Sequence, residues 1–467
     1  MAVDRTRCWL WGILTLALGL RLLAAVLVQQ HVAQTPGRLC LIAGDAEGYW
    51  ELGRQLARGQ NYEIYQPPRR ILRMPGFPAL LAVSIALFGE NVGIARMVLA
   101  VVGTLACGGV YWLGAELFDR NIGLIAAGLA AVSPTFVVSS VMMLSETAFA
   151  LGLLLSLITL TWLTRSQYLP GTSRSRSMGL GILAGLTATV ACYVRPSWLL
   201  FPPAAAGWLV IACVWDRVGS SISTLRNSRL LAAAALLLGM ALGLAPWICR
   251  NYLVTDGRIV PTTLWMGPSL YDGLNPKANG DSHMEFLQHD ALYQTQSEFA
   301  VDQYYRHAAW TWAARNPGRV VELGWIKLQR YWNLWPNTPQ FNHWLIKASL
   351  LLFLLPMFGL AVWGLIRGLG SVTSNALPWS WLLILTAGPI LYFSGLHTIF
   401  VSSLRYRLPA EYPLLILTAV GLRDVVRTGT ATTVATWRML LASAPTLAAS
   451  ATTVIAAPVL TRSINRQ

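Results

Sequence analysis

The chain has 467 residues, of which 55% are hydrophobic and only 12% are charged. Soluble domains carry about 25% charged residues, and several apolar runs here are about 20 residues long, enough to cross a hydrocarbon core. The composition excludes a soluble protein and predicts an all-α polytopic membrane protein, because helices satisfy their own backbone in lipid. The formal net charge of +15 lies in connecting loops and not in a basic domain or tail, so we expect no nucleic acid partner.

The first apolar run covers about Cys8 to Val28 and follows Arg5 and Arg7. It resembles a secretory signal, but it is long and no clear small-x-small cleavage site follows. We therefore expect an uncleaved first span with a cytoplasmic N-terminus. Arg21 lies in the outer half of this span, where it either snorkels to the interface or turns inward toward a phosphate.

The apolar segment Pro75–Glu90 is short and contains prolines and glycine, which favours an interfacial or re-entrant helix over a span. This choice sets the side of the membrane on which every later loop lies. With this segment on the outer surface, the sequence predicts ten to eleven spans in all. Those after the first are expected at about Val92–Ala115, Asn121–Val141, Glu146–Leu163, Met178–Cys192, Trp198–Trp215, Leu230–Ile248, Lys347–Ile366, Trp379–Leu396 and Leu408–Leu422, with Ala435–Val459 as a weak further candidate.

The connecting loops agree with this topology. Arg165–Ser177 contains three arginines and no acidic residue, and Asp216–Arg229 contains three arginines and one aspartate. Both would be cytoplasmic, as the positive-inside rule requires, whereas a full span at Pro75–Glu90 would turn Arg165–Ser177 outward. The long loop Arg250–Leu345 is then external, and its tryptophan-rich helical patterns are typical of helices lying on lipid headgroups.

In this topology the unusual polar residues gather at the outer face. Asp45 and Glu47 follow the first span, and Arg69, Arg70 and Arg73 follow within thirty residues. Charges at a membrane edge are costly, so their gathering on one face indicates a site. A carboxylate can take a proton from an attacking hydroxyl, and arginines can hold a phosphate and stabilise it as it leaves. The pattern predicts chemistry on a lipid-borne phosphate.

Six short motifs occur in a fixed order over most of the chain. They are Asp45–Trp50, Arg73-x-Pro75-Gly76-Phe77-Pro78, Leu144-Ser145-Glu146-Thr147, Arg195-Pro196-Ser197, Pro246-Trp247-x-x-Arg250-Asn251-Tyr252 and Arg405-Tyr406-Arg407-x-Pro409. With these motifs the chain resembles the GT-C superfamily of polyprenyl-phosphate-sugar glycosyltransferases, most closely the branch of the protein O-mannosyltransferases (glycosyltransferase family 39) and the lipid A aminoarabinose transferases. The resemblance implies a GT-C-type fold with outer-face juxtamembrane helices, a lipid-phosphate sugar donor and inversion at the anomeric carbon. It also implies an outward-facing active site in a bacterial inner membrane.

The resemblance assigns roles to the carboxylates. Asp45 matches the general base, although a helix N-cap is the competing interpretation. Glu47 would orient Asp45, contact the acceptor or join a metal ion, or else lie on a solvated helix face. Glu146 matches the acidic residue of the second outer loop, or else a charge favoured at a helix N-terminus. Tyr49 would contact the acceptor or the sugar, or anchor the interface.

The basic residues are expected to hold the donor phosphate, although arginines at a membrane edge also bind bulk lipid. Arg73, Arg405 and Arg407 are the first candidates, Arg250 and Arg195 follow, and Lys277 comes last. A divalent cation is left open, because no local spacing demands one; Asp45, Glu146 and His397 are its candidate ligands. A histidine at the end of a span is more often structural.

Several alternatives stay open from the sequence. The acceptor could be a glycan, a lipid or a protein. The competing functions are a lipid or sugar transporter or flippase, and a non-catalytic membrane scaffold. Cys40 could pair with Cys192 or Cys249 near the outer face. We expect a catalytic domain at residues 1–427, with loops 31–91 and 250–345 capping the active site, and a tail or extra span at 428–467.

Overall fold

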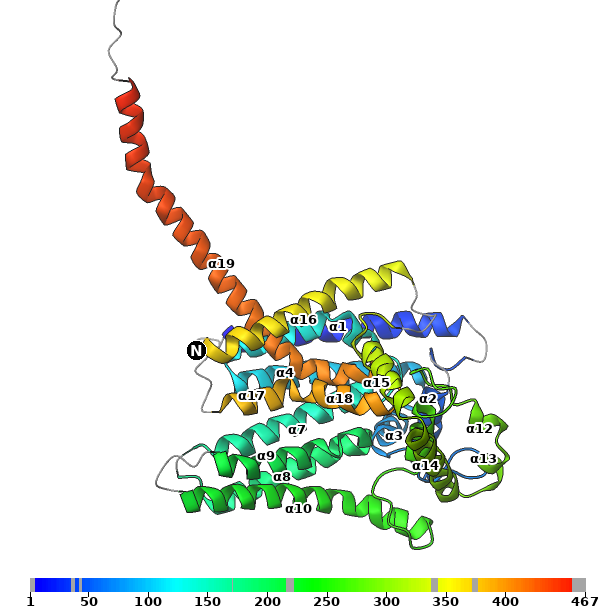
Figure 1. Cartoon of the computed structure of the whole chain (residues 1–467). Coiled ribbons are helices and arrows are strands. Elements are labelled where there is room, and N and C mark those ends of the chain that lie inside the picture. Colours follow the sequence, from blue (N-terminus) through cyan, green and yellow to red (C-terminus); the bar gives the residue numbers. More distant parts are fainter. Residues whose placement is uncertain are drawn as a thin grey trace, which may run out of the picture.

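The computed structural model describes residues 5–34, 38–41, 44–169, 171–215, 222–336, 343–371 and 377–455. Most of the described residues lie in helices, and β pairing within these ranges is limited to one isolated bridge between Ile64 and Arg69. Long helices run side by side, and short helices gather at one end of the bundle (Figure 1). The all-α fold predicted from composition is confirmed.

Six helices in the described ranges are long and apolar enough to cross a membrane, which makes the chain an integral membrane protein. A bent pair, α17 (Trp379–Thr386) and α18 (Gly388–Ile399), makes a seventh if it counts as one span, with a bend of 55°. Pro389 supplies no backbone N–H and so interrupts the helix there. The six are α1 (Arg5–Ala33), α4 (Val92–Leu117), α7 (Glu146–Ser166), α8 (Arg174–Val194), α10 (Ile222–Val254) and α16 (Trp344–Ser371).

The other expected spans fall on helices that do not meet this length and composition test in the described ranges. The expected span Asn121–Val141 is divided into α5 (Arg120–Val132) and α6 (Pro134–Ser139), since Pro134 ends the helix and Ser133 before it is extended. The span at Trp198–Trp215 is α9 (Phe201–Trp215), preceded by the turn η1 (Pro196–Trp198).

The last expected spans fall on α19 (Leu404–Ile455), which continues as one helix well beyond the bundle (Figure 1). The weak candidate span at Ala435–Val459 lies on its outer part, and residues 456–459 lie outside the described ranges.

The segment Pro75–Glu90 is a short helix, as predicted. Helix α3 (Gly76–Phe88) has 13 residues and lies against α2 (Asp45–Ala57) at the end of the bundle (Figure 1). The two helices pack closely because Gly53 of α2 has no side chain: a Cβ there would lie 2.9 Å from the Cβ of Leu81. This packing holds the first turn of α2 near the membrane edge.

The two ends of the bundle differ in character. Arg165 at the end of α7 pairs with Glu116 at 2.6 Å, and Arg423 pairs with Asp119. These residues, expected on one side of the membrane, therefore gather at one end. Glu146 begins α7 at the other end, and a helix of 21 residues separates the two ends by roughly 30 Å. Helix α1 begins, at Arg5, at the end of the bundle away from the short helices (Figure 1).

The long loop after α10 folds into a cap of short helices. Its Glu298 accepts hydrogen bonds from the backbone N–H groups of Arg70 and Ile71, at 2.8 and 3.1 Å. Arg69 donates to the carbonyl of Gln296. The loop between α2 and α3, which belongs to the predicted first outer loop (31–91), is thereby joined to the cap. The cap comprises α11 (Met266–Gly273), α12 (Phe286–His289), α13 (Ala291–Thr295), α14 (Glu298–Arg315) and α15 (Pro317–Trp332).

Two expectations for buried groups are corrected. Arg21 is fully buried and donates to the carbonyls of Ala130 and Ala131 at the end of α5, so it neither snorkels nor faces the cap. The pairing of Cys40 with Cys192 or Cys249, which the sequence left open, is not formed, because all three thiols are free. Cys40 and Cys192 belong to separate apolar clusters, and Cys249 is exposed.

Candidate functional site

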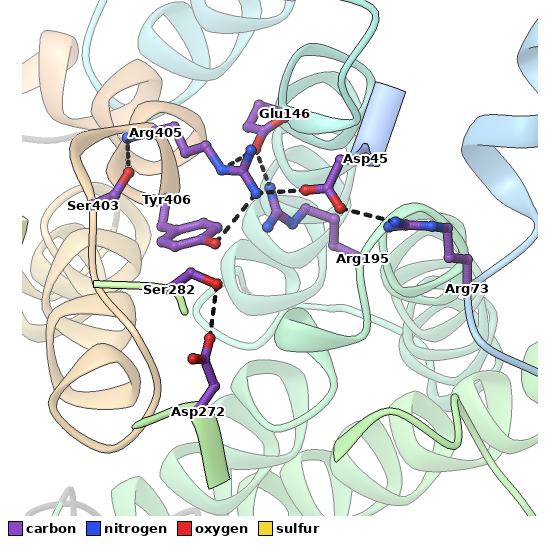
Figure 2. Close-up of polar contacts among 9 residues, drawn as sticks. All are labelled: Asp45, Arg73, Glu146, Arg195, Asp272, Ser282, Ser403, Arg405 and Tyr406. Carbon is purple, nitrogen blue, oxygen red and sulfur yellow. Dashed lines mark hydrogen bonds and ion pairs between the residues drawn. The ribbon is translucent and has the colours of Figure 1, made fainter. Parts of the chain in front are cut away.

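A cluster of charged side chains lies where α2, α7, α8 and α19 meet beneath the cap (Figure 2). Asp45 is the first residue of α2, and both of its carboxylate oxygens are occupied. Oδ1 accepts from Nη2 of Arg73 at 2.8 Å, and Oδ2 accepts from Nη2 of Arg405 at 2.8 Å. The Asp45 side chain is nevertheless 39% exposed, so an incoming group can reach it.

The position of Arg73 depends on its neighbours in α2. Its guanidinium lies over the ring of Tyr49 at 4.3 Å from the centroid, a cation–π contact. Tyr49 in turn meets Phe77 edge-on at 4.9 Å. A Cβ at Gly48 would lie 3.6 Å from Nε of Arg73, an ordinary van der Waals contact, so the guanidinium lies directly beside α2.

Glu146 links the remaining arginines. Its Oε1 is 2.8 Å from Nη1 of Arg195 and 3.5 Å from Nε of Arg405. The Glu146 side chain is only 5% exposed, and its Oε2 is buried without a hydrogen-bond partner. Glu146 begins α7 and Arg195 follows the last residue of α8, so each charge has the sign that its helix end favours.

Two motif residues explain how distant segments reach one place. A Cβ at Gly76 would lie 2.7 Å from the carbonyl of Tyr193, so only glycine allows α3 to approach the end of α8 this closely. Pro196 keeps Arg195 extended, with φ −145° and ψ 121°, where α8 ends. The close approach brings the Arg73 loop to Arg195.

The cluster carries a net positive charge. Three guanidiniums (Arg73, Arg195 and Arg405) surround two carboxylates (Asp45 and Glu146), which leaves one excess positive charge. Burial alone would raise the pKa of Asp45, but Arg73 and Arg405 outweigh it and hold that pKa well below its ordinary value of 3.8. The site is therefore suited to an anion that can share these arginines.

Tyr406 is a site residue that the sequence did not single out. Its hydroxyl accepts from Nη2 of Arg405 at 3.3 Å, and Arg195 lies over its ring at 5.3 Å. The imidazole of His397 stacks on the Tyr406 ring. The two ring centroids are 4.6 Å apart, and the rings are within 5° of parallel. The only signal in the sequence was its place next to Arg405.

The cap supplies a wall of the site. Ser282 donates from its hydroxyl to Oδ2 of the buried Asp272 at 2.7 Å, and Figure 2 shows this pair beside Tyr406. Arg330 of α15 pairs with Asp281 at 2.6 Å and donates to the carbonyl of Ser402. The cap loop is thereby held against the segment that precedes Arg405.

Two predicted phosphate ligands lie elsewhere. Arg407 is fully buried, pairs with Glu411 at 2.5 Å and donates to the carbonyls of Tyr331 and Asn333. It points away because residues two apart on a helix such as α19 do not share a face. Arg250 donates to the carbonyls of Arg70 and Tyr62, so it anchors the first outer loop.

Two further candidates are exposed near the site's edge. Glu47 lies on the outer side of α2, and its Oε2 accepts a long hydrogen bond of 3.5 Å from the backbone of Gly44. Lys277 lies on the loop after α11, also exposed. Neither joins the arginine–carboxylate cluster.

The proposed metal ligands do not gather as a cation site. Among the described residues, no group of three or more His, Cys, Asp or Glu side chains is placed to share an ion. Both Asp45 oxygens face guanidiniums, and Nδ1 of His397 donates to the carbonyl of Val401 at 2.7 Å. The residues present do not fit a divalent cation as they lie.

A family model described as dolichyl-phosphate-mannose-protein mannosyltransferase matches residues 68–247. This stretch contains Arg73, Glu146 and Arg195 but neither Asp45 nor Arg405. No curated protein matches the chain.

Two solved structures share the fold. One is the archaeal oligosaccharyltransferase AglB from Archaeoglobus fulgidus in complex with an inhibitory peptide and a dolichol-phosphate, at 16% identity and a TM-score of 0.56, covering 91% of this chain and 51% of that one. The other is ArnT from Cupriavidus metallidurans bound to undecaprenyl phosphate, at 16% identity and a TM-score of 0.52. This match covers 93% of this chain and 64% of that one. The chain thus spans about half the length of AglB.

These findings confirm the predicted resemblance. The chain has the GT-C fold, and it resembles the GT-C superfamily of polyprenyl-phosphate glycosyltransferases, to which AglB and ArnT belong.

Proposed function

We propose that the protein is a membrane glycosyltransferase that moves a sugar from a polyprenyl-phosphate donor to an acceptor hydroxyl. One observation carries this proposal: an exposed carboxylate, Asp45, lies 2.8 Å from two arginines that bracket it at the membrane edge. The lipid phosphates in the AglB and ArnT structures support a donor of this class. The acceptor is a glycan, a lipid or a protein.

The proposed reaction is a single displacement that inverts the anomeric carbon. Asp45 takes the proton of the acceptor hydroxyl while the oxygen of that hydroxyl forms a bond to the anomeric carbon. The bond between that carbon and the phosphate oxygen breaks, and the lipid phosphate leaves with the electron pair. Arg73 and Arg405 stabilise the charge that develops on the phosphate. Electrostatic stabilisation of this kind is usually the largest single contribution to lowering the reaction barrier.

The arrangement of charges gives the arginines a double role. A carboxylate held by two guanidiniums is a weak base, because its charge is already compensated. A donor phosphate offers the same guanidiniums a second anionic partner, and bidentate arginines suit phosphate oxygens. Donor binding would therefore loosen the hold on Asp45 at the step where a base is needed.

The other polar groups have proposed places around this reaction. The free Oε2 of Glu146 is positioned to accept from a sugar hydroxyl, while Arg195 holds the other oxygen, Oε1, at 2.8 Å. Tyr49 lines the donor side through Arg73, while Glu47 and Lys277 face outward and are proposed acceptor contacts. The first outer loop (31–91) and the cap (250–345) would enclose the acceptor within a catalytic domain of residues 1–427.

We further propose a bacterial inner membrane location with the cap outside and the N-terminus in the cytoplasm. Arg165 at the end of α7 and Arg423 on α19 lie at the end of the bundle opposite the cap, which agrees with the positive-inside rule.

The test is transfer from radiolabelled polyprenyl-phosphate sugars to membrane components, with wild type and Asp45→Asn side by side. The substitution removes the base but keeps the side-chain shape, so we expect transfer to fall by about 10²–10⁴-fold with normal folding. Near-normal transfer by Asp45→Asn would remove Asp45 from this role. Lipid binding without transfer by wild type would favour a flippase or scaffold, and adding EDTA tests the cation that the sequence left open.

A further inference from the structure

Tyr406 contacts both arginines that bracket Glu146. Its hydroxyl accepts from Arg405 at 3.3 Å, and the guanidiniums of Arg405 and Arg195 lie 5.0 and 5.3 Å from its ring centroid. Figure 2 shows the ring between Arg405 and the cap pair Asp272–Ser282. A long arginine side chain has many rotamers, so contacts of this kind decide where the guanidinium lies.

His397 fixes the plane of the Tyr406 ring. The two rings are parallel to within 5°, with centroids 4.6 Å apart. Nδ1 of His397 lies 2.7 Å from the carbonyl oxygen of Val401, which can only accept, so Nδ1 carries the proton and the ring orientation is set. The histidine thus presents a flat face of defined direction.

The His397 ring also stacks with the ring of Tyr331, with centroids 6.0 Å apart and an interplanar angle of 20°. Tyr331 is fully buried, and its hydroxyl donates to the carbonyl of Ile390 at 3.2 Å. Its own carbonyl accepts from Nη1 of Arg407 at 2.6 Å, and Arg407 is paired with Glu411. The stack therefore rests on a fully buried base.

We propose that Tyr331, His397 and Tyr406 form an aromatic column whose function is to hold Arg405 and Arg195 in position for a lipid-borne phosphate. This inference rests on the proposed function and assigns positioning roles to His397, Tyr406 and, through Tyr331, Arg407. The column runs from Tyr331, which is fully buried, to the guanidiniums of Arg405 and Arg195, which would bind the anion.

Position favours this role over proton transfer or metal binding by His397. Two tyrosine rings, Tyr331 and Tyr406, stack with its ring, and Nδ1 is hydrogen-bonded to the carbonyl of Val401. No second carboxylate or imidazole completes a cation site with it among the described residues. What the ring provides to Tyr406 is a flat surface, and a phenylalanine would provide that surface without the hydrogen bond to Val401.

The test uses full-length protein in lipid nanodiscs and two readouts: the Kd for undecaprenyl phosphate, and kcat and KM for the sugar donor. Tyr406→Phe keeps the ring but loses the hydroxyl, so we expect affinity to weaken about threefold to tenfold. Tyr406→Leu loses both contacts, and we expect about tenfold to 100-fold weaker binding with a matching rise in donor KM.

Tyr412→Leu is the matched control for a general loss of packing. Tyr412 lies six residues after Tyr406 on α19 and is buried. Its ring stacks on that of Phe136, with centroids 3.8 Å apart, and none of its described contacts is with the charged cluster. We expect this variant to melt at a lower temperature than wild type but to bind undecaprenyl phosphate with the wild-type Kd. A change in Kd equal to that of Tyr406→Leu would overturn the column.

His397→Phe and His397→Leu separate stacking from imidazole chemistry. The column predicts that phenylalanine retains donor affinity within about threefold, whereas leucine weakens it about tenfold. Equal loss in both would show that a flat ring at position 397 does not hold Tyr406 in place, which would contradict the column.

The outcomes for this inference and for the proposed function are distinguishable. An active wild type whose Tyr406 variants bind and transfer normally would overturn the column alone. A wild type that binds the lipid phosphate without transferring sugar, with binding weakened in Tyr406→Leu, would overturn the proposed reaction and support the column. A wild type that does neither would overturn both.

Discussion

Each oxygen of the Asp45 carboxylate accepts from a different arginine, so Asp45 and a donor phosphate would compete for the same guanidiniums. Arg405 is the more central of the two, because it also lies 3.5 Å from Glu146. Arg405→Gln removes the charge that a leaving phosphate needs, and we expect transfer to fall by about 10²–10³-fold. Steady-state kinetics with a polyprenyl-phosphate sugar would measure this loss.

Arg250→Gln is the matched control, since Arg250 donates to backbone carbonyls of the first outer loop and to Asn251. It should lower the melting temperature while leaving the donor KM of the folded protein unchanged. If Arg250→Gln raised KM as much as Arg405→Gln, the phosphate would lie nearer to Arg250 than proposed.

The two arginines also set the pH behaviour of Asp45. They lower its pKa more than burial raises it, so the carboxylate is ionised at every pH above its ordinary value of 3.8. The ion pairs therefore stabilise the fold above that value, and this stabilisation is lost only as pH falls through the lower folded-state pKa. We expect kcat/KM, which reports the free enzyme, to show no acid limb from Asp45 between about pH 5 and 8. An acid limb in that range that Asp45→Glu displaces would contradict this.

At the scale of helices, the site depends on how closely α3 approaches α8. A Cβ at Gly76 would lie 2.7 Å from the Tyr193 carbonyl, closer than side chains tolerate. Gly76→Ala should therefore separate the two helices, cost about 1–3 kcal/mol of stability and reduce transfer by displacing Arg73 from Arg195. Thermal melting in detergent and the transfer assay would measure both effects.

Gly128→Ala in α5 provides the comparison. Nothing lies within 4 Å of the position of its Cβ, and alanine favours a helix over glycine by about 1 kcal/mol. This variant should be neutral or stabilising. A Gly76→Ala protein that melts and transfers like Gly128→Ala would show that the close approach does not position the arginines.

At the scale of the whole molecule, the charged cluster lies at one end of the bundle beneath the cap (Figure 1). Transporters place their substrate sites near the bilayer midplane, whereas Glu146 and Asp45 begin their helices and Arg195 follows the end of one. A site at the membrane edge suits a donor whose tail stays in lipid while its phosphate and sugar project out. The fold shared with AglB and ArnT agrees with this arrangement.

Much of the site was accessible from the sequence because its residues follow the ends of apolar segments. Asp45, Arg73, Glu146, Arg195 and Arg405 were named as candidates, and the structure brings all five together. Arg407 was named with Arg405, but helical geometry turns it into the core. Tyr406 was passed over, since an aromatic residue at a membrane edge is usually an anchor.

The sequence by itself determined the class of fold and the gathering of charged residues at one end of the helices, because hydrophobic length and charge at span ends are local properties of the chain. It also placed the short helix at Gly76–Phe88 correctly. Only the tertiary structure decided which arginines meet Asp45, which ones hold backbone carbonyls, and that His397 and Tyr406 stack. These depend on contacts between residues up to 360 positions apart, such as Asp45 with Arg405, which no local pattern encodes.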